Sequence, residues 1–179
     1  IVFSQEKRNK AGHRKFSFNL AILDLKTREV REIDVFDSAY NMNPAFSSDD
    51  RHIFFLSDAD GFRNMYKYEI GTGQLLRLTS YMTGVSGITP YSPAMSWSRD
   101  GDKTAYNYYI KNSYHIVVAD VDDFKPAEAD GSVISLEAGT LPPLDHAAVN
   151  LVDSALYSRK VVEPLPDDSA ANVQAVRTG

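Results

Sequence analysis

The sequence predicts an all-β protein, a partial β-propeller of four-stranded antiparallel blades with an extended C-terminal tail. Two observations predict this fold. Residues 43–80 recur in looser form about fifty residues later, and Phe46 corresponds to Trp97 at a spacing of 97 − 46 = 51. The repeat consists of short apolar or alternating runs closed by turn residues, as β-strands are. Self-similarity with this period, at four strands per unit, is typical of propeller blades.

The middle copy, residues 43–80, shows the four strands most completely. Residues 52–57 are almost continuously apolar, which is expected of a strand covered on both faces. Residues 64–70 alternate between apolar and polar side chains. Residues 74–79 are predicted to form an edge strand, because polar side chains such as Arg77 keep one side in water.

Two less complete copies flank the middle one. Residues 1–36 form an incomplete blade that has lost its first strand, and Asn19 matches Asn64 at a spacing of 64 − 19 = 45. Residues 93–138 form the third blade, which has a longer link after its third strand. Residues 132–136 are expected to supply its last strand.

The expected domain organisation is one propeller part over residues 1–138 and a Pro-rich linker or tail over residues 139–179. We expect one short helix in the tail, around residues 149–157. The chain enters its first blade at what is predicted to be the second strand, without an initiator Met or a leader. We therefore expect it to be a fragment of a longer protein.

Composition excludes several classes of function. Hydrophobic residues make up 43% and charged residues 24% of the 179 residues, as in ordinary globular proteins. The net charge of −5 argues against a nucleic-acid partner, and the basic stretch at residues 7–15 is expected to be a solvated loop. No apolar run approaches the roughly 20 residues that span a bilayer, so membrane association is expected only through other domains. The chain has no cysteine.

The repeat resembles the WD-like repeats of TolB-type β-propellers. The third copy carries Trp97-Ser98 and Asp100-Gly101 of that pattern. The middle copy carries the others, which are Pro44, Ser47, Asp49, Ser57-Asp58, Gly61, Met65-Tyr66, Gly73 and Leu78-Thr79. The resemblance covers residues 1–138 and implies a non-catalytic propeller whose remaining blades lie elsewhere in the same protein or in an assembly.

The resemblance also implies a location and a role. A propeller followed by a linker is similar to bacterial envelope proteins in which a TolB-like domain precedes a membrane domain. This implies a protein-binding or scaffolding part of a bacterial cell-envelope protein, in the periplasm or associated with the outer membrane. The alternative is the non-catalytic propeller of a prolyl-oligopeptidase-type serine peptidase, which TolB-like propellers also resemble.

The sequence offers no catalytic residue that we would assign. Ser86 lies between Gly84 and Gly87, but the spacing does not fit the Gly-x-Ser-x-Gly elbow of such hydrolases, and no apolar strand precedes it. We interpret this segment as a loop between blades, and expect no enzyme activity from this chain.

Metal or cofactor binding is not expected either. The histidines His13, His52, His115 and His146 are too scattered for a zinc site. The turn Asp58-Ala59-Asp60-Gly61 could offer two carboxylates to calcium but is better explained as a plain turn. Asp24, Glu69 and Asp120 recur at the ends of third strands, where we expect structural hydrogen bonds to neighbouring turns.

Partner binding is expected on the connections between successive blades, which open on one face of a propeller. Aromatic and amide side chains in these connections are typical of recognition surfaces. The candidate partner-binding residues are Tyr40, Asn41, Tyr81 and Tyr91.

Overall fold

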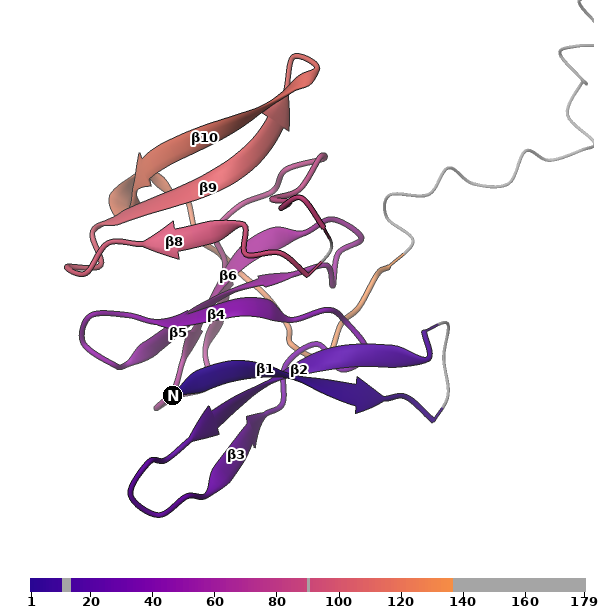
Figure 1. The fold of residues 1–179 in the computed structure, drawn as a ribbon, viewed down its shortest axis with the longest axis vertical. Coiled ribbons are helices and arrows are strands. Elements are labelled where there is room, and N and C mark those ends of the chain that lie inside the picture. Colours follow the sequence, from indigo (N-terminus) through magenta and orange to yellow (C-terminus); the bar gives the residue numbers. More distant parts are fainter. Residues whose placement is uncertain (11–13, 90, 137–179) are drawn as a thin grey trace, which may run out of the picture. The chain divides into compact units, whose positions relative to one another are not determined.

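The structure is a computed structural model that describes residues 1–10, 14–89 and 91–136. The described residues are all-β, with three antiparallel sheets that follow one another along the chain (Figure 1). Besides the strands they contain one short 3-10 helix, η1 (Val121–Asp123). The all-β prediction is confirmed. The helix expected around residues 149–157 lies outside the described residues.

Sheet A is formed by the first three strands of the chain. Its order is β1 (Val2–Arg8), β2 (Phe16–Leu23) and β3 (Val30–Ile33). The two pairings are antiparallel, with Leu20 of β2 opposite Ile33 of β3. Neither pairing contains a bulge, so alternate side chains of β2 point to opposite faces of the sheet.

Sheet B is the largest and contains strands from two distant parts of the chain. Consecutive strands pair with one another, and a fifth strand from after sheet C joins the outer edge. Its strands are β4 (Met42–Phe46), β5 (His52–Ser57), β6 (Asn64–Glu69), β7 (Leu75–Arg77) and β11 (Ala127–Glu128). The prediction of an edge strand over residues 74–79 is therefore wrong, because β11 pairs with β7 on its outer side.

Sheet C has three strands in the described residues. They are β8 (Met95–Trp97), β9 (Lys103–Ile110) and β10 (Ser113–Asp120), with β10 at the edge. The expectation that residues 132–136 form a fourth strand of this sheet is wrong.

The segment after β11 runs back toward sheets A and B instead of joining sheet C. The Phe36 amide donates to the Gly131 carbonyl at 2.7 Å, and the Ser135 amide donates to the Ala59 carbonyl at 2.6 Å. Ile134 packs against the apolar cluster shared by sheets A and B. Burial of this side chain, together with two backbone hydrogen bonds, accounts for the path that the segment takes.

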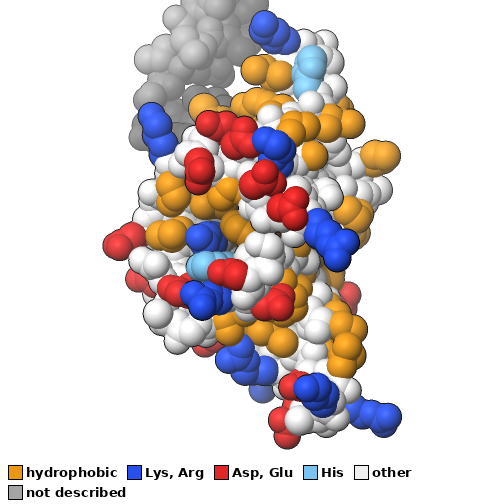
Figure 2. Space-filling model, turned by 90° about the vertical axis from the view of Figure 1, so that its left-hand side faces the viewer, with side chains coloured by type: hydrophobic (Ala, Val, Ile, Leu, Met, Phe, Trp, Pro, Cys, Tyr) orange, Lys and Arg blue, Asp and Glu red, His pale blue; other side chains and the backbone are white. Residues whose placement is uncertain are grey.

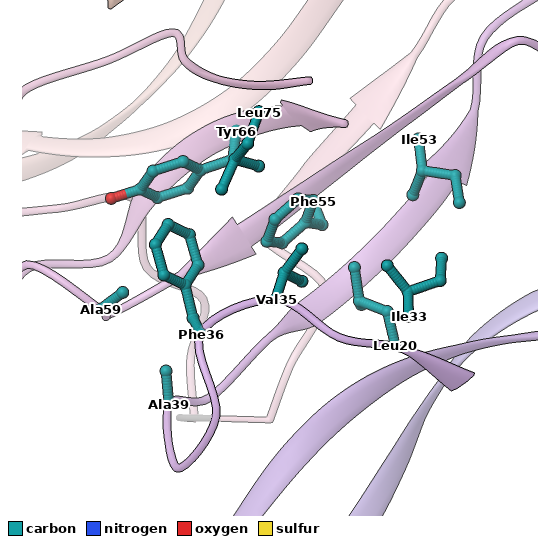
Figure 3. Close-up of a cluster of buried hydrophobic side chains, with 10 residues drawn as sticks. All are labelled: Leu20, Ile33, Val35, Phe36, Ala39, Ile53, Phe55, Ala59, Tyr66 and Leu75. Atoms are coloured by element: carbon teal, nitrogen blue, oxygen red, sulfur yellow. The ribbon is translucent and has the colours of Figure 1, made fainter. Parts of the chain in front are cut away.

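The core lies between the sheets and is divided in two by β5. Ile53 and Phe55 point toward sheet A, into the cluster shown in Figure 3, whereas Phe54 and Leu56 point into a second cluster with sheet C. This follows from the period of two of a β-strand. The prediction that residues 52–57 form a strand covered on both faces is confirmed.

The equivalent aromatic residues Phe46 and Trp97 both fill spaces between sheets, as predicted. Phe46 packs against the cluster between sheets A and B. The indole ring of Trp97 stacks on Phe54, with ring centroids 3.8 Å apart and an interplanar angle of 20°. One aromatic residue per repeat therefore contacts the preceding sheet.

The acidic residues at the ends of the third strands of the repeats have structural roles. Two of the three bind a neighbouring turn, as expected, and the third does not. Asp24 accepts hydrogen bonds from the amides of Lys26 and Thr27, and Glu69 accepts one from the Thr72 hydroxyl. Both bind the turn that follows, as expected. Asp120 differs, because it pairs across the sheet with Lys103.

Candidate recognition surface

Two of the four predicted partner-binding residues, Tyr40 and Tyr91, lie together around Phe18. The ring centroid of Phe18 is 5.5 Å from that of Tyr40 and 5.6 Å from that of Tyr91. The two tyrosine rings are 6.5 Å apart. Tyr91 is 57% exposed, so the cluster presents an aromatic surface to the solvent. These distances are those of interacting aromatic rings.

An arginine and an aspartate hold this cluster in place. The Arg14 guanidinium lies 4.3 Å from the centroid of the Tyr40 ring and pairs with Asp58 at 2.7 Å. The other carboxylate oxygen of Asp58 accepts the Tyr40 backbone amide at 2.8 Å. Both partners of the ion pair are partly buried, and together the contacts orient the Tyr40 ring. We call Arg14, Phe18, Tyr40, Asp58 and Tyr91 the aromatic–arginine cluster.

Asn41 is fully buried and does not belong to an exposed surface. Its side-chain amide donates to the carbonyls of Val35 and Phe36, at 3.0 and 3.3 Å. Its backbone amide donates to the Phe18 carbonyl. Because these bonds fix the connection that precedes β4, Asn41 positions its neighbour Tyr40 and offers a partner no surface of its own.

Tyr81 belongs to a different cluster, between sheets B and C. Its hydroxyl lies 2.6 Å from the Tyr106 hydroxyl, and its ring lies 4.5 Å from that of Tyr108. Burial raises the pKa of Tyr106 well above its ordinary value, and the hydrogen bond with Tyr81 raises it further by a smaller amount. Tyr106 therefore stays protonated and neutral, and the pair is a packing contact.

Three members of the aromatic–arginine cluster were not predicted. Arg14 and Asp58 are 44 residues apart, and no spacing rule connects residues so distant. Arg14 lies in the basic stretch interpreted as a solvated loop, and Asp58 in a segment interpreted as a turn. The signal that was available is weak: Phe18 belongs to an apolar alternation that begins at Phe16 on β2, and it shares its face with Leu20.

The described residues hold no arrangement suited to nucleophilic catalysis. Ser113 and His115 are 2.8 Å apart, but both are exposed, and no carboxylate orients the imidazole there. The Ser47 hydroxyl donates to Asp49 directly, whereas a catalytic triad needs the imidazole between serine and carboxylate. In the described part of the chain, Ser86 makes no hydrogen bond with a histidine.

Both carboxylates of the turn after β5 are bound to protein groups. Asp58 pairs with Arg14, and Asp60 pairs with Arg77 at 3.2 Å. The Gly61 amide donates to the Asp58 carbonyl, and Gly61 has a positive φ of 85°, which confirms the turn. Over residues 1–10, 14–89 and 91–136, no group of three metal-ligating side chains comes together. The same residues include no helix long and apolar enough to cross a membrane.

Stacked antiparallel sheets, two of which place an aromatic residue against the preceding sheet, define the fold class as a partial β-propeller. The chain is similar in structure to TolB from Acinetobacter baumannii, with a TM-score of 0.53 and 21% sequence identity. The match covers 71% of this chain and 29% of that chain, so the present chain spans less than a third of the TolB structure. The fold is therefore TolB-like. No family model matches the chain, and no curated protein matches its sequence.

Proposed function

We propose that this chain is a non-catalytic, protein-binding or scaffolding part of a bacterial cell-envelope protein, located in the periplasm or at the outer membrane. One observation carries the proposal: the aromatic–arginine cluster combines an exposed Tyr91 with a Tyr40 ring that Arg14 and Asp58 hold rigidly. Tyrosine and arginine are the residues that contribute most to protein interfaces. The TolB-like fold supports the envelope location.

The cluster is suited to a protein partner by its chemistry. The phenol groups supply apolar area and a hydrogen-bonding tip at a low entropic cost, because a tyrosine side chain has few rotatable bonds. The Arg14 charge is already paired with Asp58. The surface therefore contributes to binding mainly through aromatic contacts, and the partner needs little opposite charge.

Site-specific photo-cross-linking tests the proposal. A benzophenone amino acid replaces Tyr91, and the protein is irradiated in an envelope extract from a Gram-negative bacterium. We expect one defined cross-linked protein band. Tyr40→Ala in the same protein should remove the band, because the aromatic ring beside the probe is lost. The variant should still fold, since Tyr40 lies outside the buried core.

The matched control places the same probe at Met82, which is 81% exposed in another loop. A band that appears equally from position 82, or that persists unchanged with Tyr40→Ala, would contradict a partner at this cluster. So would a failure of the Tyr91 probe to cross-link any protein in the extract.

A further inference from the structure

The outer edge of sheet C is open in the described residues. In sheets A and B, β3 and β7 lie outside β2 and β6, whereas β10 is the outermost strand of sheet C. The residues that could have continued sheet C pair with β7 instead, through β11. A strand edge of eight residues is thus left without a neighbouring strand over residues 1–10, 14–89 and 91–136.

The register of the hairpin shows which backbone groups of β10 are free to pair. Lys111 and Asn112 form a two-residue turn with φ values of 51° and 64°. Beyond the other end of the hairpin, the Val121 amide donates to the Asp102 carbonyl at 2.8 Å. Because hydrogen-bonded and non-hydrogen-bonded pairs alternate in an antiparallel ladder, every second residue of β10 directs its amide and carbonyl away from β9. These residues are Asp120 and the three apolar residues Tyr114, Ile116 and Val118.

The same three residues carry the most exposed apolar side chains of sheet C. Tyr114 is 64% exposed, Ile116 78% and Val118 65%. Apolar side chains are visible at the surface of the upper part of the described unit in Figure 2, at the height where Figure 1 shows sheet C. An added strand would therefore gain backbone hydrogen bonds and apolar contacts from the same residues.

Residues 114–119 lack the sequence features that usually protect a strand edge. Residues 114–119 include no proline and no charged side chain, and β10 pairs with β9 over eight consecutive residues without a bulge. Long, regular and apolar strand edges of this kind associate with other strands unless proline, lysine or a bulge interrupts them. The edge has the properties of a pairing surface.

We propose that β10 pairs with β10 of a second copy of this chain, antiparallel, about a two-fold axis at Ile116. In this register Tyr114 lies opposite Val118 of the partner subunit, and Ile116 lies opposite Ile116 of the partner subunit. An aromatic residue beside a β-branched residue is a favourable cross-strand pair. Both copies contribute the same patch, as a two-fold interface requires.

Charges at the two ends of β10 favour the antiparallel arrangement. Lys111 lies in the turn that precedes β10, and the exposed Asp120, Asp122 and Asp123 lie where β10 ends. Asp120 also pairs with Lys103 of its own chain, so Asp122 and Asp123 supply the unshared negative charge. Antiparallel pairing brings Lys111 of each copy beside the acidic end of the other. Parallel pairing would place Lys111 beside Lys111 of the partner subunit. The sequence of β10 is thus complementary to itself, which is why a second copy fits this edge better than an unrelated strand.

Sedimentation velocity over a range of protein concentrations tests the proposal on the full chain. We expect a monomer–dimer equilibrium. Ile116→Lys should raise the dimer Kd by about tenfold or more, because it places a charge at the centre of the strand pair. The matched control is Ile88→Lys, since Ile88 is 98% exposed and lies outside sheet C. It should leave the Kd unchanged.

Single cysteines test the register, since the chain has no cysteine of its own. Ile116→Cys should cross-link to itself with a short bismaleimide, whereas Ile88→Cys should not. A mixture of Tyr114→Cys and Val118→Cys should give a heterodimeric cross-link at higher yield than either variant alone.

Three results would overturn the proposal: a monomer at all concentrations, a dimer insensitive to Ile116→Lys, or equal cross-linking from positions 88 and 116. A monomer would exclude a second copy of this chain as the strand that pairs with β10. None of these results bears on partner binding at Tyr91, so the two proposals fail separately.

Discussion

Sheets B and C are built from the same repeat but differ in what covers them. Met65 of β6 and Ile116 of β10 occupy the same place, at a spacing of 116 − 65 = 51. Met65 is fully buried, and its equivalent in sheet A, Leu20, is fully buried too. Ile116 is 78% exposed. The comparison teaches that the repeat determines which face of a strand is apolar, whereas burial depends on whether another sheet follows.

The largest expected difference between the two sheets concerns this pair of positions. Met65→Ala should lower the free energy of unfolding by about 2–5 kcal/mol, because it leaves a cavity between sheets B and C. Ile116→Ala should change it by only about 0.5 kcal/mol, as for other exposed sites. Urea unfolding at a concentration where the protein is monomeric measures both. Equal losses would show that another part of the chain covers Ile116.

A second pair of equivalent residues compares polar groups, Asn64 and His115, again at a spacing of 115 − 64 = 51. Asn64 is 1% exposed, and its carbonyl oxygen accepts hydrogen bonds from the Thr79 hydroxyl and the Tyr81 amide. Asn64→Ala leaves these donors without a partner and should cost about 1–3 kcal/mol.

His115 provides the control for this change, because its side chain is exposed and hydrogen-bonds with the exposed Ser113. His115→Ala should alter stability by at most about 0.5 kcal/mol. Thermal unfolding followed by circular dichroism at pH 8 compares the two variants. A loss for His115→Ala as large as that for Asn64→Ala would show that sheet C is covered as sheet B is.

The smallest expected effect concerns the turns between first and second strands, where sheets B and C are alike. A hydrogen bond from Ser47 lowers the pKa of Asp49 from 3.8 to about 2, and a bond from Ser98 lowers the pKa of Asp102. A carboxyl group whose pKa is lower in the folded than in the unfolded protein stabilises the fold at pH values above its ordinary pKa. This stabilisation is lost as the pH falls through the pKa of the folded state. Asp49→Asn should therefore be slightly less stable than the parent at pH 6.

This deficit should shrink as the pH falls from about 4 to about 2, because Asp49 is then protonated in the parent as well. Urea midpoints across this pH range measure it. Asp49 is solvent-exposed, so the effect is small. A deficit that stays constant down to pH 2 would exclude the Ser47–Asp49 bond as its source.

The strands were predictable because their information is local. The continuous apolar run of β5, the alternation of β6 and the glycine of the Asp58–Gly61 turn each indicate their own conformation from a few neighbouring residues. The repeat adds the order of the strands, and the inter-sheet roles of Phe46 and Trp97 follow from their equivalent places.

The remaining features depend on contacts between distant residues. Two residues of β11 are too short to show a period, so nothing in the sequence directs them to β7. Asn41 is polar and lies in a connection between strands, which predicts an exposed side chain. It is nevertheless buried, and it donates three hydrogen bonds to backbone carbonyls. The aromatic–arginine cluster brings together one strand and four separate connections between strands. Such contacts are decided by tertiary packing, which local patterns do not encode.

The hydrogen bond between Phe36 and Gly131 joins residues 131 − 36 = 95 positions apart in the chain. During synthesis, Phe36 therefore leaves the ribosome long before its partner exists. Sheet B gains its outermost strand only after every residue of sheet C has been made. Contacts of such long range slow folding. Sheet B therefore keeps an unfinished edge until residues 127–131 have been translated.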